Sequence, residues 1–195
     1  MFSMYNQLLE VILNQIIPET KISVLKGNKI FGGAILKKKD LTPVVIGVNN
    51  EILNPLYHGE IVTLNKFFSS DYHHKTTPSE YIFLSTHEPC SLCLSAITWG
   101  GFDNFYYYFP YSKTKDEFNI PHDLNILKEV FNIQNGKYSK KNKYWKSFSI
   151  INEINKIKTA DIKILITKIQ KINNEYSLLS KLYQKNKNIN KIPLN

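Results

Sequence analysis

The chain has 195 residues, of which 43 % are hydrophobic, so it is long enough to bury the core of one globular domain. It contains no run of the ~18 consecutive apolar residues that a membrane-spanning helix needs, so we expect no membrane partner. The formal net charge is +9 and all 25 basic residues are lysine; without the bidentate guanidinium of arginine, this charge is weak evidence for nucleic-acid binding.

The N-terminal half predicts a helix followed by a hairpin. Apolar residues recur at helical spacing over Met4–Ile17, and Pro18 is expected to end that helix. Ile30–Leu36 and Val44–Val48 have the composition of strands, and the turn-forming segment between them, 37–43, predicts an antiparallel pair.

The middle of the chain predicts a second helix and a buried strand. Asn54 is suited to the N-cap and Pro55 to the first helical position, which places His58 and Glu60 in the first turn of that helix. Tyr81–Ser85 is a continuous apolar run, typical of a strand at the centre of a sheet.

A strand–helix–strand unit follows. Residues 86–89 lead into a helix that carries Cys90 and Cys93 and ends at Gly100 and Gly101. Phe105–Phe109 is then a fourth strand. Short connections in this order predict that the third and fourth strands are parallel.

The C-terminal part predicts a lysine-rich loop over 136–146 and one long amphipathic helix capped by Thr159 or Asp161. Its apolar stripe consists of Ile162, Leu165, Ile166, Ile169, Ile172, Tyr176, Leu179 and Tyr183. We therefore expect a main domain over 1–150 and a helical extension over 151–195 that packs on the domain or on a second subunit. Residues 185–195 carry few apolar groups and are expected to be loose.

Two short motifs carry the chemistry. His58-Gly59-Glu60 offers one nitrogen ligand and a carboxylate two residues later, and Cys90 and Cys93 offer two sulfur ligands from one helix face near its N-terminus. Three protein ligands suit a catalytic zinc, and a glutamate that is not a ligand can move protons for the water in its fourth position. The combined H-x-E and P-C-x-x-C pattern is the signature of zinc-dependent nucleobase deaminases.

Other interpretations of the cysteines are possible. A C-x-x-C pair can be a redox pair, but no thioredoxin-like context surrounds this one. His87 could complete a closed Cys₂His₂ zinc site, which would be structural rather than catalytic. The chain has no other cysteine, which argues against a disulfide-stapled secreted protein and for a reducing, cytoplasmic location; the N-terminus also lacks the features of a signal peptide.

The motifs resemble those of the zinc-dependent cytidine-deaminase-like superfamily. Residues 86–93 are similar to the T-x-E-P-C-x-M-C stretch of bacterial guanine deaminases and tRNA adenosine deaminases, and 94–99 to the L-G-A-I-x-W that follows in guanine deaminases. Residues 54–60 resemble N-D-P-T-A-H-A-E, with one residue missing and Gly59 where alanine is usual. Asn49 stands where the family has a base-contacting asparagine in G-x-N. The resemblance extends from about Ile30 to Phe109.

The resemblance implies a three-layer α/β/α fold with a mixed sheet, usually assembled as a homodimer. It implies that His58, Cys90 and Cys93 hold Zn²⁺, that Glu60 transfers protons, and that Asn49 hydrogen-bonds the base. Water activated at the metal would convert an amidine carbon to an oxo group and release ammonia.

Three functions remain open at this stage. The first is deamination of a free purine base, with guanine as the first candidate, in purine metabolism. The second is a tRNA-specific adenosine deaminase that uses the lysines as point charges on phosphate. The third is a non-catalytic binding module with the deaminase fold, against which the intact H-x-E motif argues.

Overall fold

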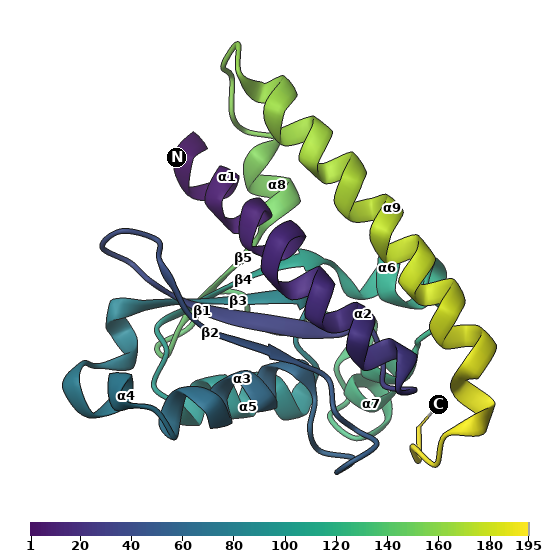
Figure 1. Cartoon of the computed structure of the whole chain (residues 1–195). Coiled ribbons are helices and arrows are strands. Elements are labelled where there is room, and N and C mark those ends of the chain that lie inside the picture. The colour runs from purple at the N-terminus through teal and green to yellow at the C-terminus, as the bar shows by residue number, and fades with distance from the viewer. Residues whose placement is uncertain (195) are drawn as a thin grey trace.

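The computed structural model describes residues 1–194, which form a five-stranded mixed sheet with helices on both faces (Figure 1). The strands are β1 (Gly32–Lys37), β2 (Pro43–Val48), β3 (Tyr81–His87), β4 (Asn104–Phe109) and β5 (Lys146–Ser149). Their order is β2-β1-β3-β4-β5, in which β1 is antiparallel to β2 and to β3, whereas β3, β4 and β5 run parallel. The predicted hairpin and the predicted parallel pair are both confirmed.

The helices and short 3₁₀ turns occupy the segments between and after the strands. They are α1 (Phe2–Val11), α2 (Ile17–Leu25), α3 (Gly59–Phe68), α4 (Asp71–Lys75), α5 (Ser91–Trp99), α6 (Tyr111–Asp116), α7 (His122–Glu129), α8 (Ile150–Ile154) and α9 (Ile162–Asn186), with 3₁₀ turns at Pro78–Glu80, Gln134–Gly136 and Lys187–Ile189. This arrangement confirms the α/β fold class with its mixed sheet and C-terminal helix.

The sheet separates two apolar cores because successive strand residues point to opposite faces. Leu36, Leu84 and Tyr108 face the core shared with α1, α8 and α9. Ile35 and Phe83 face the other core, which α3 and α5 cover. Strand β3 lies in the middle of the sheet and is buried along its whole length, as its apolar run predicted.

The first helix does not end at Pro18. A π-helical turn over Ile12–Ile16 follows α1, and α2 continues from Ile17 with Pro18 in its first turn. Proline has no N–H to donate, and the first turn of a helix segment is where that loss is tolerated. The expectation that Pro18 terminates the helix was therefore wrong.

The second predicted helix begins later than expected. Residues 54–57 form turns, in which Asn54 Oδ1 accepts from the Leu56 N–H at 3.0 Å, and α3 starts at Gly59 with His58 as its N-cap residue. The Asn54 cap was thus wrong, because the asparagine closes a local turn instead. The consequence is that His58 stands immediately before the helix rather than inside it.

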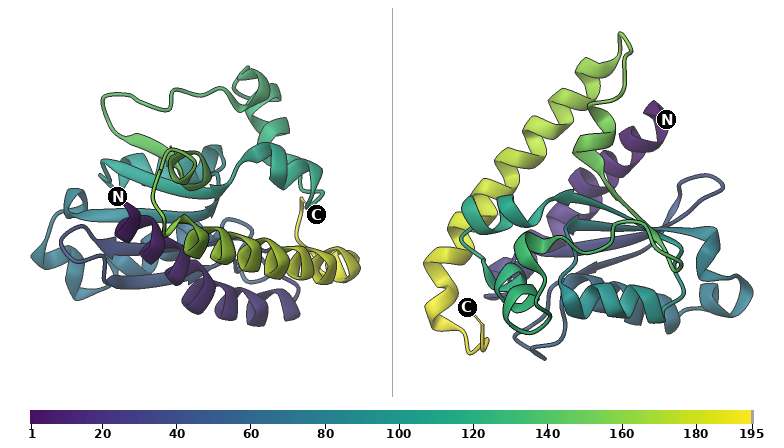
Figure 2. Two further views of the ribbon diagram at one scale, coloured as in Figure 1. Left: turned by 90° about the horizontal axis from the view of Figure 1, so that it is seen from above. Right: turned by 180° about the vertical axis from the view of Figure 1, so that it is seen from behind.

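Helix α9 lies alongside α1 and α2 on one face of the sheet (Figure 2). Leu165, Ile172, Tyr176, Leu179 and Tyr183 of the predicted stripe are buried there, so this chain's own helices cover the stripe. Ile166 is exposed and does not belong to the buried face.

The described part of the C-terminal segment is docked, contrary to expectation. The Asn190 side-chain amide donates to the Gly27 carbonyl at 2.7 Å, and Ile192 is buried. Two specific anchors therefore replace the large apolar surface that the segment lacks. Among residues 1–194, no helix combines the length and apolar character needed to cross a bilayer.

Candidate metal centre

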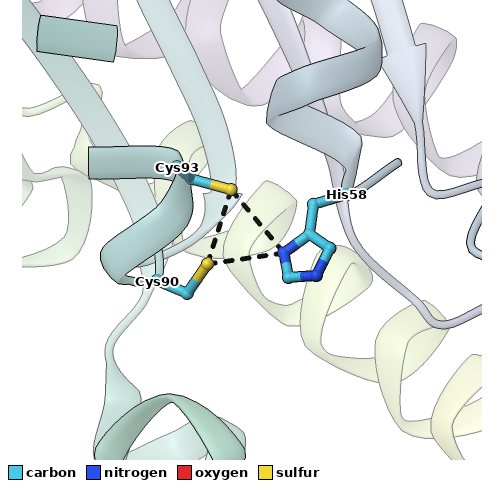
Figure 3. A group of neighbouring side chains, drawn as sticks. All are labelled: His58, Cys90 and Cys93. Carbon is cyan, nitrogen blue, oxygen red and sulfur yellow. Dashed lines mark hydrogen bonds between the residues drawn. The ribbon is translucent and has the colours of Figure 1, made fainter. Parts of the chain in front are cut away.

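Two helix N-termini bring together His58, Cys90 and Cys93 (Figure 3). His58 is the N-cap residue of α3, Cys90 is the N-cap residue of α5, and Cys93 lies in the first turn of α5. The helix dipole is positive at this end, which favours the thiolate form of both cysteines. The predicted convergence of the two motifs is present in the fold.

The spacing of the three ligand atoms fits zinc. His58 Nδ1 lies 3.4 Å from Cys90 Sγ and 3.7 Å from Cys93 Sγ, and the two sulfurs are 3.6 Å apart. Bond lengths of about 2.0–2.1 Å to nitrogen and 2.3 Å to sulfur at tetrahedral angles place ligand atoms roughly 3.5–3.8 Å apart. Two thiolates and a neutral imidazole also match the charge of Zn²⁺.

The cluster is open on one side. Within the described residues, no fourth histidine, cysteine or carboxylate belongs to the group of three. His87 instead packs among aromatic rings: it is buried, and its ring lies 4.7 Å from that of Phe31 and 5.0 Å from that of Phe109. The closed Cys₂His₂ alternative therefore has no support in the geometry, and three ligands leave a position for water.

Each of the three side chains affects the charge of its neighbours in the cluster. Burial acts to lower the pKa of His58, but the Cys90 sulfur and the nearby carboxylates outweigh it and raise the pKa of His58 to about 9. The hydrogen bond between the sulfurs, together with His58, holds the pKa of Cys90 well below its usual value, whereas burial raises that of Cys93.

Glu60 lies beside the cluster, buried in the first turn of α3. The Ser85 hydroxyl donates to its Oε1 at 2.8 Å, while its Oε2 lies 3.4 Å from Cys93 Sγ. Burial is the main reason that the pKa of Glu60 is raised above its ordinary value. One oxygen is thus anchored by β3 and the other faces the metal ligands, which suits a group that transfers protons.

A cavity of about 250 Å³ opens next to His58 and Cys90. Its apolar wall is contributed by several parts of the chain: Phe31, Pro55, Leu56, Leu92, Ile120, Ile126, Pro193 and Leu194. Besides His58 and Cys90, its charged or polar residues are fewer: Lys29, Glu51, Ser91, His122 and Asp123. An apolar cleft with a few convergent polar groups is the usual form of a small-molecule site.

Asp123 is a candidate site residue that the sequence did not indicate. It is in the first turn of α7 and lines the space that His58, Glu60 and Cys90 also line. Burial raises the pKa of its carboxyl well above the usual value, and the Cys90 thiolate adds to this effect. The sequence could not indicate Asp123 as a site residue, because it is a single aspartate in a segment that resembles no known motif.

Asn49, the expected base-contacting residue, is fully buried at the end of β2. Its Oδ1 accepts from the backbone N–H groups of Lys29 and Glu51 at 3.3 and 3.2 Å, and its Nδ2 donates to Glu51 Oε2 at 2.6 Å. Glu51, not Asn49, lines the 250 Å³ cavity. The contact of Asn49 with a base stays a prediction.

Comparison with known proteins places the chain in a family. Residues 9–109, just over half of the chain, match the model of the cytidine and deoxycytidylate deaminase zinc-binding region. The chain therefore belongs to this family and is a cytidine-deaminase-like zinc deaminase. A search of curated proteins finds no match.

Solved structures that match this chain include the following three, of which the first, with a TM-score above 0.5, shows the shared fold. Guanine deaminase from Bacillus subtilis is 20 % identical, with a TM-score of 0.52 over 85 % of this chain and 93 % of that one. Guanine deaminase from Nitrosomonas europaea is 12 % identical, with a TM-score of 0.49 over 81 % and 82 % of the two chains. A tRNA:A34 deaminase is 16 % identical, with a TM-score of 0.46 over 67 % and 92 %.

Proposed function

We propose that this zinc deaminase acts on a free purine base, with guanine as the first candidate, and converts its amidine carbon to an oxo group with release of ammonia. His58, Cys90 and Cys93 would hold the zinc, which when bound supplies Lewis-acid activation of water. The observation that carries the proposal is the open three-ligand cluster with Glu60 Oε2 at its edge and a small cavity beside it.

Glu60 would carry out the proton transfers. Because Ser85 holds Oε1, the other oxygen, Oε2, which faces the metal ligands, would be the atom that accepts the proton of the attacking water. The same oxygen would deliver this proton to the ring nitrogen of the base, then take the remaining proton of the added hydroxyl and deliver it to the amino group, which leaves as ammonia. A pKa raised by burial improves Glu60 as a base near neutral pH and as an acid once it is protonated.

The size of the cavity favours a free base. Its volume of about 250 Å³ lies just below the range of roughly 300–1,000 Å³ that is typical of drug-sized ligands. The motif resemblance to guanine deaminases, residues 94–99 in particular, points to the same class. Asp123 and Glu51 line this space, and the oxygens of such carboxyl groups are acceptors suited to the N–H groups that guanine offers.

We also propose that Asn49 contributes to substrate recognition indirectly. Its side-chain amide holds the carboxylate of Glu51, and Glu51 lines the cavity. A homodimer remains a proposal that rests on the family resemblance.

The decisive experiment is an ammonia-release screen over free bases, nucleosides, nucleotides and tRNA, using zinc-loaded protein and its Glu60→Gln variant. We expect turnover of a free purine by the wild type and none by the variant. Turnover of tRNA with none of free bases would favour the tRNA adenosine deaminase. No turnover of any substrate by the zinc-loaded protein would favour the binding module.

A further inference from the structure

Glu51 is a buried carboxylate that no motif includes and that reaches the candidate metal centre. It lies in the turn after β2, and its side chain is only 3 % exposed. Its Oε1 is 3.7 Å from His58 Nε2, the ring nitrogen on the opposite side from Nδ1. Figure 3 shows that Nδ1 faces the two sulfurs while Nε2 points away from them.

The carboxylate is held in place from both sides. The Lys29 ammonium pairs with Oε1 at 2.9 Å, and the Asn49 amide donates to Oε2 at 2.6 Å. Asn49 Oδ1 in turn accepts from the backbone N–H groups of both Lys29 and Glu51. Asn49 therefore ties the two charged residues into one unit and gives the Glu51 carboxylate a single orientation.

The buried ion pair of Lys29 and Glu51 contributes little to the stability of the fold by itself. Removing two charges from water carries a desolvation penalty that their mutual attraction often fails to offset, and an apolar pair of similar volume is commonly as stable. The ion pair has an advantage over an apolar pair if the Glu51 carboxylate also interacts with a further group. His58 is that partner, because a histidine that binds a metal through Nδ1 carries its proton on Nε2, opposite Glu51.

We propose that Glu51 is the positioning residue of His58: its carboxylate fixes the tautomer and the ring orientation that present Nδ1 to the metal. The inference rests on the assignment of His58 as a metal ligand. At 3.7 Å the two atoms interact through charge, and an approach of about 0.7 Å gives an ordinary hydrogen bond. A carboxylate behind a metal-binding histidine typically contributes 10–100-fold to metal affinity or activity.

The test measures zinc affinity by competition with a chromogenic chelator, and it does not require activity. Glu51→Gln removes the charge but leaves Lys29 buried without its partner, which by itself destabilises a protein. The double variant Glu51→Gln/Lys29→Met removes both charges and separates the two effects. Lys29→Met is the matched control, since it disrupts the same pair, carries the same cost of one unpaired buried charge, and leaves the Glu51 carboxylate facing His58.

We expect the double variant to bind zinc 10–100-fold more weakly than the wild type, and Lys29→Met to show no comparable loss. Wild-type affinity in the double variant would overturn the proposal, because Glu51 would then serve only to neutralise Lys29. If the double variant fails to fold, Glu51→Asp is tested instead. Aspartate keeps the negative charge, but its shorter side chain moves the carboxylate away from His58. Altered visible bands of its Co²⁺ form would support positioning, and unchanged bands would contradict it.

His58→Ala separates this inference from the metal-site assignment on which it rests. Zinc binding by His58→Ala as tight as in the wild type would show that His58 is not a ligand, which refutes both. A wild type that binds zinc but deaminates nothing contradicts the proposed function alone, and the affinities of the Glu51 variants still decide the role of Glu51.

Discussion

Gly59, at the start of α3, lies directly against Gly32 of β1: a Cβ atom on Gly59 would come within 2.7 Å of the Gly32 Cα. This contact seats the N-terminus of α3 on the sheet without an intervening side chain. It thereby sets the depth at which His58 and Glu60, the neighbours of Gly59, enter the site. It also gives a physical reason for glycine where the resembling family has alanine.

Gly59→Ala should therefore push α3 away from β1. Overpacking of this kind costs about 1–3 kcal/mol, so we expect a lower melting temperature together with weaker zinc binding. Ser95→Ala, an added apolar residue on the exposed face of α5, is the control and should change neither. Unchanged zinc affinity in Gly59→Ala would mean that the contact does not set the position of His58.

The wild-type protein should contain about one zinc per chain, and Glu60→Gln should retain it while losing turnover. The amide keeps the shape of the carboxylate but cannot accept the proton of water. Metal analysis by mass spectrometry and an ammonia assay on the same samples check both halves. Loss of zinc from Glu60→Gln would instead make Glu60 a structural partner of the ligands.

Ser85→Ala should lower turnover without removing zinc. Its hydroxyl is the donor that anchors Glu60 Oε1. Hydrogen bonds to charged groups contribute about 1.5–3 kcal/mol, so kcat is expected to fall roughly 10–100-fold. Steady-state kinetics are the measurement, with Ser85→Thr as the variant that keeps a hydroxyl and should retain more activity; equal losses in both would contradict the anchoring role.

His87 should make the protein less stable in acid. Burial lowers the pKa of its imidazole to about 3 in the folded protein, compared with about 6.5 in the unfolded chain. Between pH 6.5 and 3 the unfolded chain binds the extra proton, so the free energy of unfolding falls as pH falls, by up to about 1.4 kcal/mol per pH unit. His87→Phe should have a shallower slope in denaturant titrations of metal-free protein; identical slopes would exclude this cause.

Two adjacent leucines test the packing of α9. Leu179 is buried against the core, whereas Leu178 is 61 % exposed. Leu179→Ala should cost about 2–5 kcal/mol of unfolding free energy, and Leu178→Ala should stay within ±0.5 kcal/mol. Urea unfolding of the two variants checks this. A large loss in Leu178→Ala would indicate that a second subunit covers the outer face.

Truncation before Thr159 is the harsher version of the same test. It removes the helix that covers α1 and α2, so it should lower the melting temperature and the solubility of the chain. Retention of both the melting temperature and the mass in solution would contradict a packing role for α9. Such a result would favour a membrane-surface or RNA-binding role for its stripe.

Short-range patterns in the sequence were sufficient for the parts of this protein that depend on neighbours along the chain. The H-x-E and C-x-x-C spacings identified the candidate ligands because each motif places its own residues together at one helix N-terminus; the meeting of the two helices depends on the fold. The period of the apolar residues likewise identified α9, and the apolar run of 81–85 identified the central strand. These features arise from geometry within one element, which the sequence carries directly.

The tertiary structure alone decided what lies behind and around those ligands. Lys29 and Glu51 come from two separate connections and Asp123 from the first turn of α7. No local pattern relates them, because the cavity that gathers them exists only once the sheet and α7 are in place. The same holds for Asn49, whose amide is taken up by Lys29 and Glu51, and for the helix that continues past Pro18. Partners in such contacts are chosen by the packing of distant segments, where burial determines which polar groups must satisfy one another.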